Sequence, residues 1–390
     1  MYEPLNLARC IAFVWWVLLS LILTKRNLRI KSDKRIILIY FLFTVMIIGY
    51  VVSAIVNHQN FISAFLGHHN RNIGILFLVS ILLMVLYITR VDFNVNAYIN
   101  YGLLPTFVLT IFYGLLQVFG LDPFIWFEND RTTLTLGNSD FAAALIGSLA
   151  SFPIFLFLKT NRVLAKVIIS ISAVILVYLG LYSQAFQFRV VAFIAVTVFL
   201  IIRFQELIAR NIKSFLLFTF GFVSISIILT ILNWNNLELL QRTNAVDRLD
   251  STLTGLEVFR EHLLFGVGVE QLWRFEPQYR GAQQAVRNGP NSVPDKVHNV
   301  FVDHLANGGI FVGISFIALI VLSMLLIFRM VNWKLDIIDR SFLALTSSIW
   351  VAYVLLLFIT TDNVFAMVFA YSAFGLIIKF YLVYNKRVNV

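Results

Sequence analysis

The chain contains eleven apolar runs close to the length needed to cross a bilayer, and this repetition limits its fold more than any other feature. A helix that spans the hydrocarbon core needs about 20 residues, most of them apolar. The predicted spans lie at about residues 8–24, 36–56, 73–89, 99–119, 140–158, 163–182, 188–202, 214–232, 310–329, 341–360 and 364–382. Because 60% of the 390 residues are hydrophobic and 13% are charged, against about 25% charged in soluble domains, a soluble enzyme, a disordered chain and a nucleic-acid-binding protein are excluded. We therefore expect an all-α polytopic membrane protein surrounded by membrane lipids.

The net charge of +10 is unevenly distributed over the connections between these spans. Alternate connections hold 18 Lys and Arg residues, whereas the opposite set holds four outside the long segment 233–297. The positive-inside rule places the 18 in the cytoplasm, the N-terminus outside and the C-terminus inside. The excess charge thus reports topology and is not a nucleic-acid-binding patch. The single cysteine, Cys10, excludes a disulfide framework and a multi-cysteine metal cluster.

The spans predict three regions: an N-terminal bundle of about eight spans at 1–232, an extracytoplasmic loop at 233–297, and about three C-terminal spans at 298–390. Apolar residues recur at helical spacing in the first half of the loop, opposite a polar face. They are Leu249, Leu253, Leu256, Phe259 and Leu263. This pattern predicts an amphipathic helix along the membrane surface, ended by Gly266 and Gly268. The stretch from Pro277 to Pro294 is expected to be irregular.

A dense polar cluster lies where the chain re-enters the membrane, at His298, Asn299, Asp303 and His304. Ionisable groups at membrane depth are unfavourable, so they favour a functional interpretation, although hydrogen bonding to neighbouring helices is an alternative. His298 and His304 are six residues apart, about 120° around a helix, so they do not converge on one metal ion. We expect no metal site here, and we expect His304 to pack inside the helix.

Four sequence motifs lie in or beside the predicted outer connections. Two of them are RLDSTLTGLEVFREHLLFGVGVEQ, which begins at Arg248, and HNVFVDHLANGGIFVG at 298–313. The other two lie upstream, GLDPFIWFENDRTTLTLGNSDFAAALI at 120–146 and GHHNRNIG around Arg71. Together these motifs resemble the O-antigen ligase and O-antigen polymerase superfamily, whose members typically have an Arg opening an amphipathic segment, a Gly-x-Gly after it, and a His-Asn pair before a Gly-rich re-entry.

The chain departs from the family pattern at two places. Asp140 stands where relatives often have Asn. Many relatives also have Ser-Arg-Gly at the outer end of the span near 183, where this chain has Ser183, Gln184 and Ala185. Arg189, five residues later, either replaces the missing cation from the next helix or leaves that role lost.

The resemblance implies a lipid-linked glycan glycosyltransferase of the bacterial inner membrane, with its active site facing the periplasm or cell exterior. It implies transfer of a glycan from undecaprenyl pyrophosphate to the hydroxyl of a glycan or lipid-core acceptor, without metal or cofactor and with inversion. The planar, permanently charged guanidinium of Arg248 suits the diphosphate, and His298 suits the role of base for the acceptor hydroxyl. The substrate-binding candidates are Arg71, Arg189, Asn299, His68 and His69.

Other interpretations stay open at this level. Arg248 could pair with Asp247 or Asp250, and Arg71 and Arg189 could extend towards the lipid headgroups. A transporter or flippase for a lipid-linked glycan or polar solute is the alternative function, but it should carry charges near the middle of broken helices. Ligation, polymerisation and protein glycosylation share the donor chemistry, so the sequence does not separate them or name the sugar.

Overall fold

The computed structural model describes residues 5–24, 33–69, 71–91, 95–124, 130–210, 245–288 and 296–388. Within these residues the chain is helical and contains no β-strand. In this described part, nine helical segments are long and apolar enough to cross a membrane. They are α1 (Leu5–Thr24), α2 (Lys34–Val56), the run of α5 (Val95–Tyr98), η1 (Ile99–Leu103) and α6 (Leu104–Val118), the pair α7 (Ser139–Ser148) and α8 (Ser151–Lys159), α9 (Val163–Tyr182), α10 (Phe186–Arg203), α17 (Val300–Val331), α18 (Ile337–Leu356) and α19 (Val364–Val388).

A tenth apolar helix, α4 (Ile75–Arg90), has 16 residues. These ten segments coincide with ten of the eleven predicted spans, which confirms the all-α membrane fold. The remaining predicted span, at 214–232, lies outside the described residues. The division of the chain into three regions stays a prediction.

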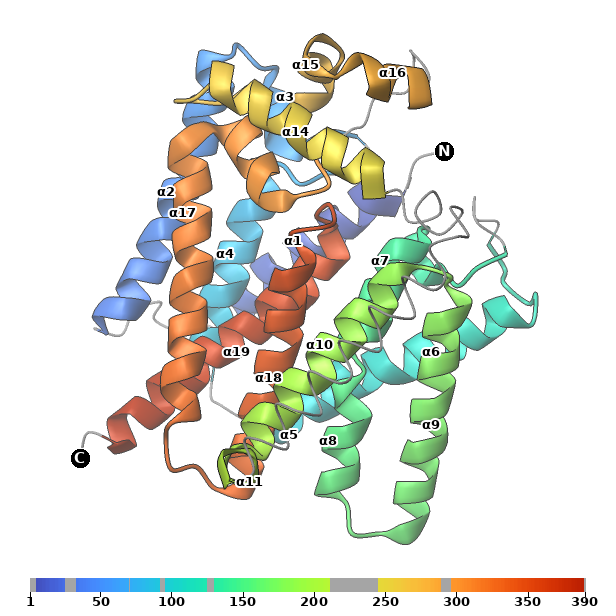
Figure 1. Ribbon diagram of the computed structural model, residues 1–390. Coiled ribbons are helices and arrows are strands. Elements are labelled where there is room, and N and C mark those ends of the chain that lie inside the picture. The colour runs from blue at the N-terminus through green and yellow to red at the C-terminus, as the bar shows by residue number, and fades with distance from the viewer. Residues whose placement is uncertain are drawn as a thin grey trace.

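The helices run between two ends of one bundle (Figure 1). At one end lie four short helices, and we call it the α14 end: α3 (Phe61–Leu66), α14 (Ala245–Glu261), α15 (Leu272–Tyr279) and α16 (Ala282–Asn288). The α8–α9 connection and α11 (Gln205–Arg210) lie at the opposite end. The basic α8–α9 connection and α11 thus lie at the end opposite to the described parts of the predicted outer segments 57–72 and 233–297, as the alternation of spans predicts.

Small residues allow the long helices to approach closely. A Cβ added to Gly49 of α2 would lie 2.7 Å from Val312 Cγ2 of α17, and one added to Gly147 of α7 would lie 2.9 Å from Val191 Cβ of α10. Helices in lipid associate through such close packing, because burial of apolar surface gives them little driving force there.

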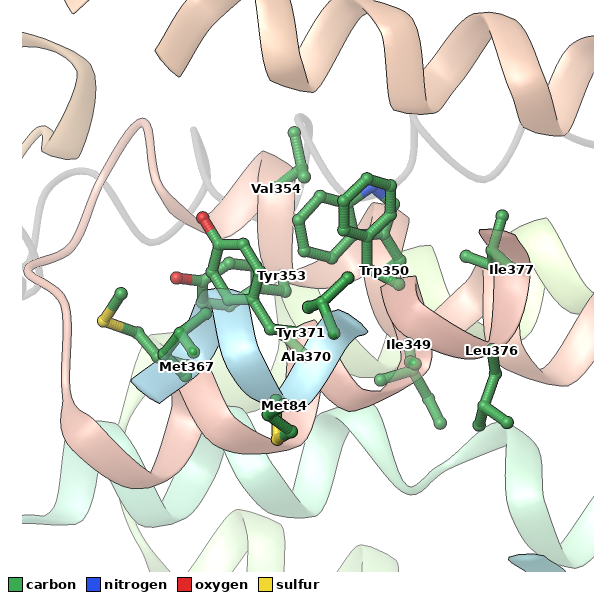
Figure 2. Close-up of a cluster of buried hydrophobic side chains, with 14 of the residues drawn as sticks. Met84, Ile349, Trp350, Tyr353, Val354, Met367, Ala370, Tyr371, Leu376 and Ile377 are labelled. Atoms are coloured by element: carbon green, nitrogen blue, oxygen red, sulfur yellow. The ribbon is translucent and has the colours of Figure 1, made fainter. Parts of the chain in front are cut away.

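Aromatic side chains fill the core between α18 and α19 (Figure 2). The rings of Trp350 and Phe374 stack with centroids 4.6 Å apart, and Tyr371 meets Trp350 edge-on at 5.2 Å. The indole N–H of Trp350 donates a 2.7 Å hydrogen bond to Ser323 Oγ of α17, so the buried polar atom is satisfied. This core supports the 357–363 connection, which lies between α18 and α19 and contributes to the site described below.

Helix α17 is interrupted at Gly309, whose φ of +75° lies in the left-handed region. A side chain there would collide with the backbone of Leu264. The break releases two carbonyl groups of α17 from their helical partners, and they accept hydrogen bonds of 3.0 Å each from the N–H groups of Val267 and Gly268. The segment that follows α14 is thereby attached to the start of α17.

The predicted amphipathic helix is present as α14, and its apolar side chains face outwards. Its exposed leucines are Leu249, Leu253, Leu256 and, just beyond its end, Leu263. The face packed on the protein carries Ser251, Thr254, Gly255 and Val258. An outward apolar stripe is what a helix lying in a lipid interface presents, and the location of α14 along the membrane surface stays a prediction.

The prediction of irregular structure from Pro277 onwards is wrong for most of that stretch. Pro277 lies inside α15, and α16 extends to Asn288. Helices of eight and seven residues are too short to show a hydrophobic period, and proline weighs against a helix in sequence reasoning. Residues 289–295 lie outside the described residues.

Candidate active site

Arg248 lies in the first half of α14 and joins it to two other segments. Its Nη2 atom lies 2.8 Å from Asp140 Oδ2 in the first turn of α7, and its Nη1 donates to the carbonyl of Ile359 in the 357–363 connection. The Asn138 side chain caps α7 by accepting hydrogen bonds from the N–H groups of Asp140 and Phe141, which fixes the position of this turn. The Arg248 guanidinium therefore forms an ion pair with Asp140, a partner other than the Asp247 or Asp250 that the alternative interpretation of the sequence named.

Arg71 reaches the same place from a different loop. Its guanidinium carbon lies 5.5 Å from the centroid of the Phe141 ring, next to Asp140. Its charge also acts on Asp362, three residues beyond Ile359. Two guanidinium groups that are 177 positions apart in the sequence thus converge on the first turn of α7.

Ser251, one helical turn beyond Arg248 on α14, links Arg248 to His298. Ser251 Oγ donates to the carbonyl of Arg248 at 3.1 Å. The same oxygen accepts from the backbone N–H of His298 at 3.3 Å and lies 3.4 Å from Nδ1 of its ring. Both residues proposed from the sequence as catalytic therefore lie at the α14 end.

The other predicted site residues have different environments. Asn299 caps α17, and its side-chain oxygen accepts from the N–H groups of Phe301 and Val302 at 3.1 and 3.3 Å. His68 and His69 form an aromatic pair with centroids 4.2 Å apart, and His68 also lies 5.3 Å from Trp273. They lie in the loop of Arg71.

Arg189 lies in the first turn of α10 and is exposed. The contacts of the described residues do not connect it to Arg71, Arg248 or His298. His304, which we expected to pack inside its helix, is buried in α17, and its Nδ1 is 2.6 Å from the Tyr50 hydroxyl of α2. That prediction is confirmed.

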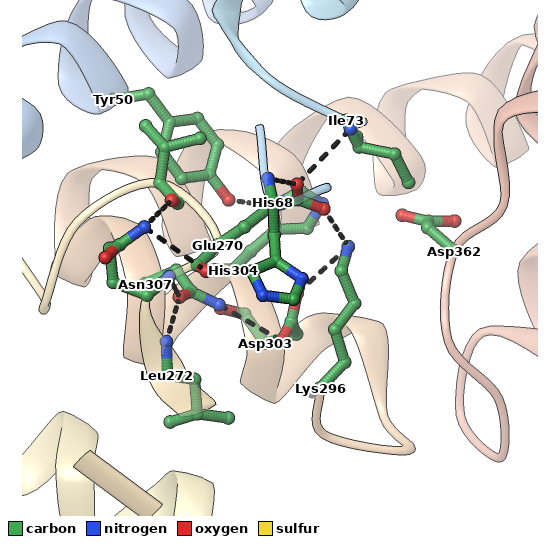
Figure 3. A network of polar contacts seen from close by, with 12 residues as sticks. Tyr50, His68, Ile73, Glu270, Leu272, Lys296, Asp303, His304, Asn307 and Asp362 are labelled. Atoms are coloured by element: carbon green, nitrogen blue, oxygen red, sulfur yellow. Dashed lines mark hydrogen bonds and ion pairs between the residues drawn. The ribbon is translucent and has the colours of Figure 1, made fainter. Parts of the chain in front are cut away.

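A buried group of charges, which the sequence analysis did not assemble, lies next to the loop of Arg71 (Figure 3). We call its four members the buried charge cluster: Glu270, Lys296, Asp303 and Asp362. Lys296 Nζ lies 2.9 Å from Glu270 Oε1 and 3.9 Å from Asp303 Oδ2. The Asp362 carboxylate accepts a 2.7 Å hydrogen bond from the Tyr353 hydroxyl.

Burial and charge act in opposite directions on this cluster. Burial lowers the pKa of Lys296, but the carboxylates of Glu270, Asp303 and Asp362 more than offset it, so the pKa lies above its usual range and the ammonium form is favoured. Burial raises the pKa of Asp362, although Lys296, the Tyr353 hydroxyl and Arg71 act against the rise.

Asn307 organises the backbone around the cluster. Its side-chain oxygen accepts from the N–H groups of Gln271 and Leu272 at 2.9 and 3.0 Å, and its Nδ2 donates to Asp303 Oδ1 at 3.1 Å. The Ser53 hydroxyl donates to the Asn307 carbonyl, which the break at Gly309 has released. The Gly-rich re-entry therefore serves to bring Glu270 to Asp303.

Residues 188–317, about one third of the chain, match the model of the family described as O-antigen ligase. This segment is therefore similar to the O-antigen ligase family. No curated protein sequence matches the chain. The matched segment contains Arg248, His298, Glu270 and Lys296, whereas Arg71 and Asp140 approach it from outside the matched residues.

Proposed function

We propose that the chain, a membrane protein with a segment similar to the O-antigen ligase family, transfers a glycan from undecaprenyl pyrophosphate to an acceptor hydroxyl. The convergence of Arg71 and Arg248 on the first turn of α7, with His298 in contact with Ser251 one turn along α14 from Arg248, carries this proposal. The family supports the general class, a glycosyltransferase of the O-antigen ligase or polymerase type acting on a lipid-linked glycan. Donor, acceptor and mechanism are the proposed refinements.

The two arginines bind the diphosphate of the donor. Negative charge grows on this leaving group as the bond to the glycan breaks, and guanidinium groups stabilise it through paired, charge-assisted hydrogen bonds. The ion pair with Asp140 and the bond to the Ile359 carbonyl hold Arg248 in place. A guanidinium has five N–H donors, so these two contacts leave capacity for an incoming phosphate.

The hydrogen bonds of Ser251 support His298 as the base. A hydroxyl has one proton to donate and two lone pairs to accept with. The proton of Ser251 goes to the Arg248 carbonyl, so its oxygen acts as acceptor towards His298. A proton on Nδ1 completes this pattern, which makes Nε2 the basic nitrogen that takes the proton of the acceptor hydroxyl.

We propose a single, metal-independent displacement that inverts the anomeric carbon. A mechanism with a covalent glycosyl-enzyme would need a carboxylate nucleophile and a second acid. The carboxylates around the arginines and His298 are engaged instead, Asp140 with Arg248 and both Glu270 and Asp303 with Lys296. Two guanidinium groups and an imidazole supply the charge stabilisation and proton transfer that one displacement requires.

The site faces the extracytoplasmic side of the inner membrane in this proposal. The opposite end of the bundle carries the basic connections around Lys159, Arg162 and Arg210, which the positive-inside rule assigns to the cytoplasm. The leucines of α14 point outwards, as expected of a helix resting in the outer leaflet, from which the polyprenyl donor would enter.

Purified protein in lipid nanodiscs, supplied with a labelled undecaprenyl-pyrophosphate glycan and acceptor, tests the proposal. We expect release of undecaprenyl pyrophosphate in step with glycan transfer, in the presence of a chelator, and loss of both in His298→Ala and Arg248→Ala. Movement of the intact donor across liposomes without bond cleavage would instead establish a flippase. In a deletion strain, loss of long glycan chains alone would indicate polymerisation, and loss of all attached chains would indicate ligation.

A further inference from the structure

One carboxylate, that of Glu270, connects the loop that carries Arg71 to the segment that carries His298. Its Oε2 accepts hydrogen bonds from the N–H groups of His68 and Ile73 at 2.6 and 3.3 Å, and its Oε1 lies 2.9 Å from Lys296 Nζ (Figure 3). The Glu270 side chain is only 5% exposed. Since both oxygens are engaged and buried, this group does not face a substrate.

The loop from residue 67 to 74 is built around that carboxylate. The two N–H groups that donate to Glu270 Oε2, those of His68 and Ile73, lie on either side of Arg71 in the sequence. Gly67 has a φ of +85°, and a side chain there would collide with Glu270 Oε2. The loop closes on itself, because the His68 carbonyl accepts from the N–H groups of Arg71 and Asn72 at 2.9 and 2.8 Å. The position of the Arg71 backbone therefore depends on the carboxylate.

The other partner of Glu270 leads directly to His298. Lys296 lies two residues before it, and Val297 between them is fully buried. A Cβ added to Gly255 of α14 would lie 2.6 Å from Val297 Cγ2, so this short segment is packed tightly on the helix that carries Arg248. The ion pair of Lys296 with Glu270 thus links the segment that carries His298 to the Arg71 loop, and the packing of Val297 holds that segment against α14.

We propose that Glu270 is a positioning residue that fixes Arg71 relative to His298. The inference rests on the proposed function, because it assumes that Arg71 binds the donor diphosphate. Glu270 acts through the loop and makes no contact with the substrate. Its removal should therefore weaken donor binding, and the acceptor KM should stay the same.

The test is a double-mutant cycle of Glu270→Gln with Arg71→Ala in nanodiscs, read as the KM for the labelled donor. Glutamine keeps the size of the side chain but loses the charge, so we expect the donor KM to rise by about tenfold, the equivalent of roughly 1.4 kcal/mol. In the Arg71→Ala background, Glu270→Gln should raise the donor KM by less than about twofold, because the guanidinium that Glu270 positions is already missing. If Glu270→Gln raises the donor KM by the same factor with Arg71 present and with Arg71→Ala, the positioning proposal is wrong.

Hydrogen exchange of the peptide that covers residues 67–74 gives a second measurement that does not depend on activity. Faster exchange in Glu270→Gln than in the unmodified protein is expected, and unchanged exchange would overturn the proposal. Glu257→Gln, at an exposed carboxylate of α14 paired with Arg260, is the matched control and should change neither measurement. If Arg71→Ala alone leaves the donor KM unchanged, the donor role of Arg71 in the proposed function is wrong. If Arg71→Ala raises the donor KM but the effects of the two substitutions are additive, the proposed function stands and the positioning role of Glu270 is wrong.

Discussion

Two regions of the site use the same kinds of side chain under different conditions. One is formed by Arg71, Arg248 and His298, and we call it the rim; the other is the buried charge cluster. The Arg248–Asp140 pair keeps side-chain exposures of 18% and 36%, whereas Lys296 and Glu270 are each 5% exposed. A partly exposed ion pair contributes less to stability than a buried one and can exchange one partner for a ligand. A buried pair is hard to break, because each charge left behind has lost its solvation. The rim is thus suited to binding and the buried cluster to holding the site together.

The largest expected effect is on catalysis at the rim. His298→Gln keeps a group that can hydrogen-bond to Ser251 but lacks a basic nitrogen, so turnover should fall by ~100- to 10,000-fold with folding intact. The measurement is the rate of undecaprenyl-pyrophosphate release at saturating donor. His58→Asn, at an exposed histidine beyond the end of α2, is the matched control and should retain full turnover. A fall of less than about tenfold in His298→Gln would show that it is not the base.

The next effect is on stability and separates the two regions directly. Lys296→Met leaves the carboxylates of Glu270 and Asp303 buried without their cation, so the free energy of unfolding should fall by about 3–5 kcal/mol. Arg248→Met, which leaves the half-exposed Asp140, should lower it by only about 1 kcal/mol. Thermal unfolding in nanodiscs compares the two variants.

The outcome that contradicts this contrast is equal destabilisation by both variants. Glu270→Gln combined with Lys296→Met supplies a further check, because it removes both charges of the closest pair together. The double variant should be more stable than Lys296→Met alone, since fewer uncompensated charges remain buried.

Much of the fold could be predicted because the signal for a span is local. Length and apolar composition alone located ten segments that the structure shows as helices, and helical spacing located α14. The missed helices α15 and α16 are too short to carry a period. The residues of the site divide in the same way, into those that a local sequence signal marks and those that only tertiary contacts bring together. Arg248 and His298 stand in motifs, so the sequence pointed to them.

The buried charge cluster could not be predicted because tertiary contacts create it. Glu270 follows a Gly-x-Gly turn, and Asp362 lies 92 positions further along the chain. They come together only because α17 breaks at Gly309 and because the loop around Arg71 folds onto Glu270. Two local signals were available, Asp303 in the polar cluster at the re-entry and Asp362 isolated between two apolar spans, but neither indicates Glu270 or Lys296 as its partner.

A smaller effect should follow from the residue that departs from the family pattern. The Asp140 carboxylate lies beside the guanidinium that is proposed to receive a diphosphate, so its negative charge opposes donor binding. Asp140→Asn keeps an oxygen that can accept from Arg248 and removes the charge. The donor KM should fall by roughly three- to tenfold, the equivalent of about 1 kcal/mol at a half-exposed site. A raised donor KM would show that the carboxylate is needed to orient Arg248.

The smallest effect is expected at Arg189, an exposed cation in the first turn of α10. If it replaces the family arginine, it acts on the donor through water, and an interaction between exposed charges is screened by salt over about 10 Å at 0.1 M. Arg189→Gln should therefore raise the donor KM by about two- to fivefold at low ionic strength, and by less at high ionic strength. Arg248→Gln should show a loss that salt changes little, because its guanidinium is mostly buried against α7. A salt-independent loss at Arg189 as large as that at Arg248 would place Arg189 in direct contact with the diphosphate and extend the rim site to the first turn of α10.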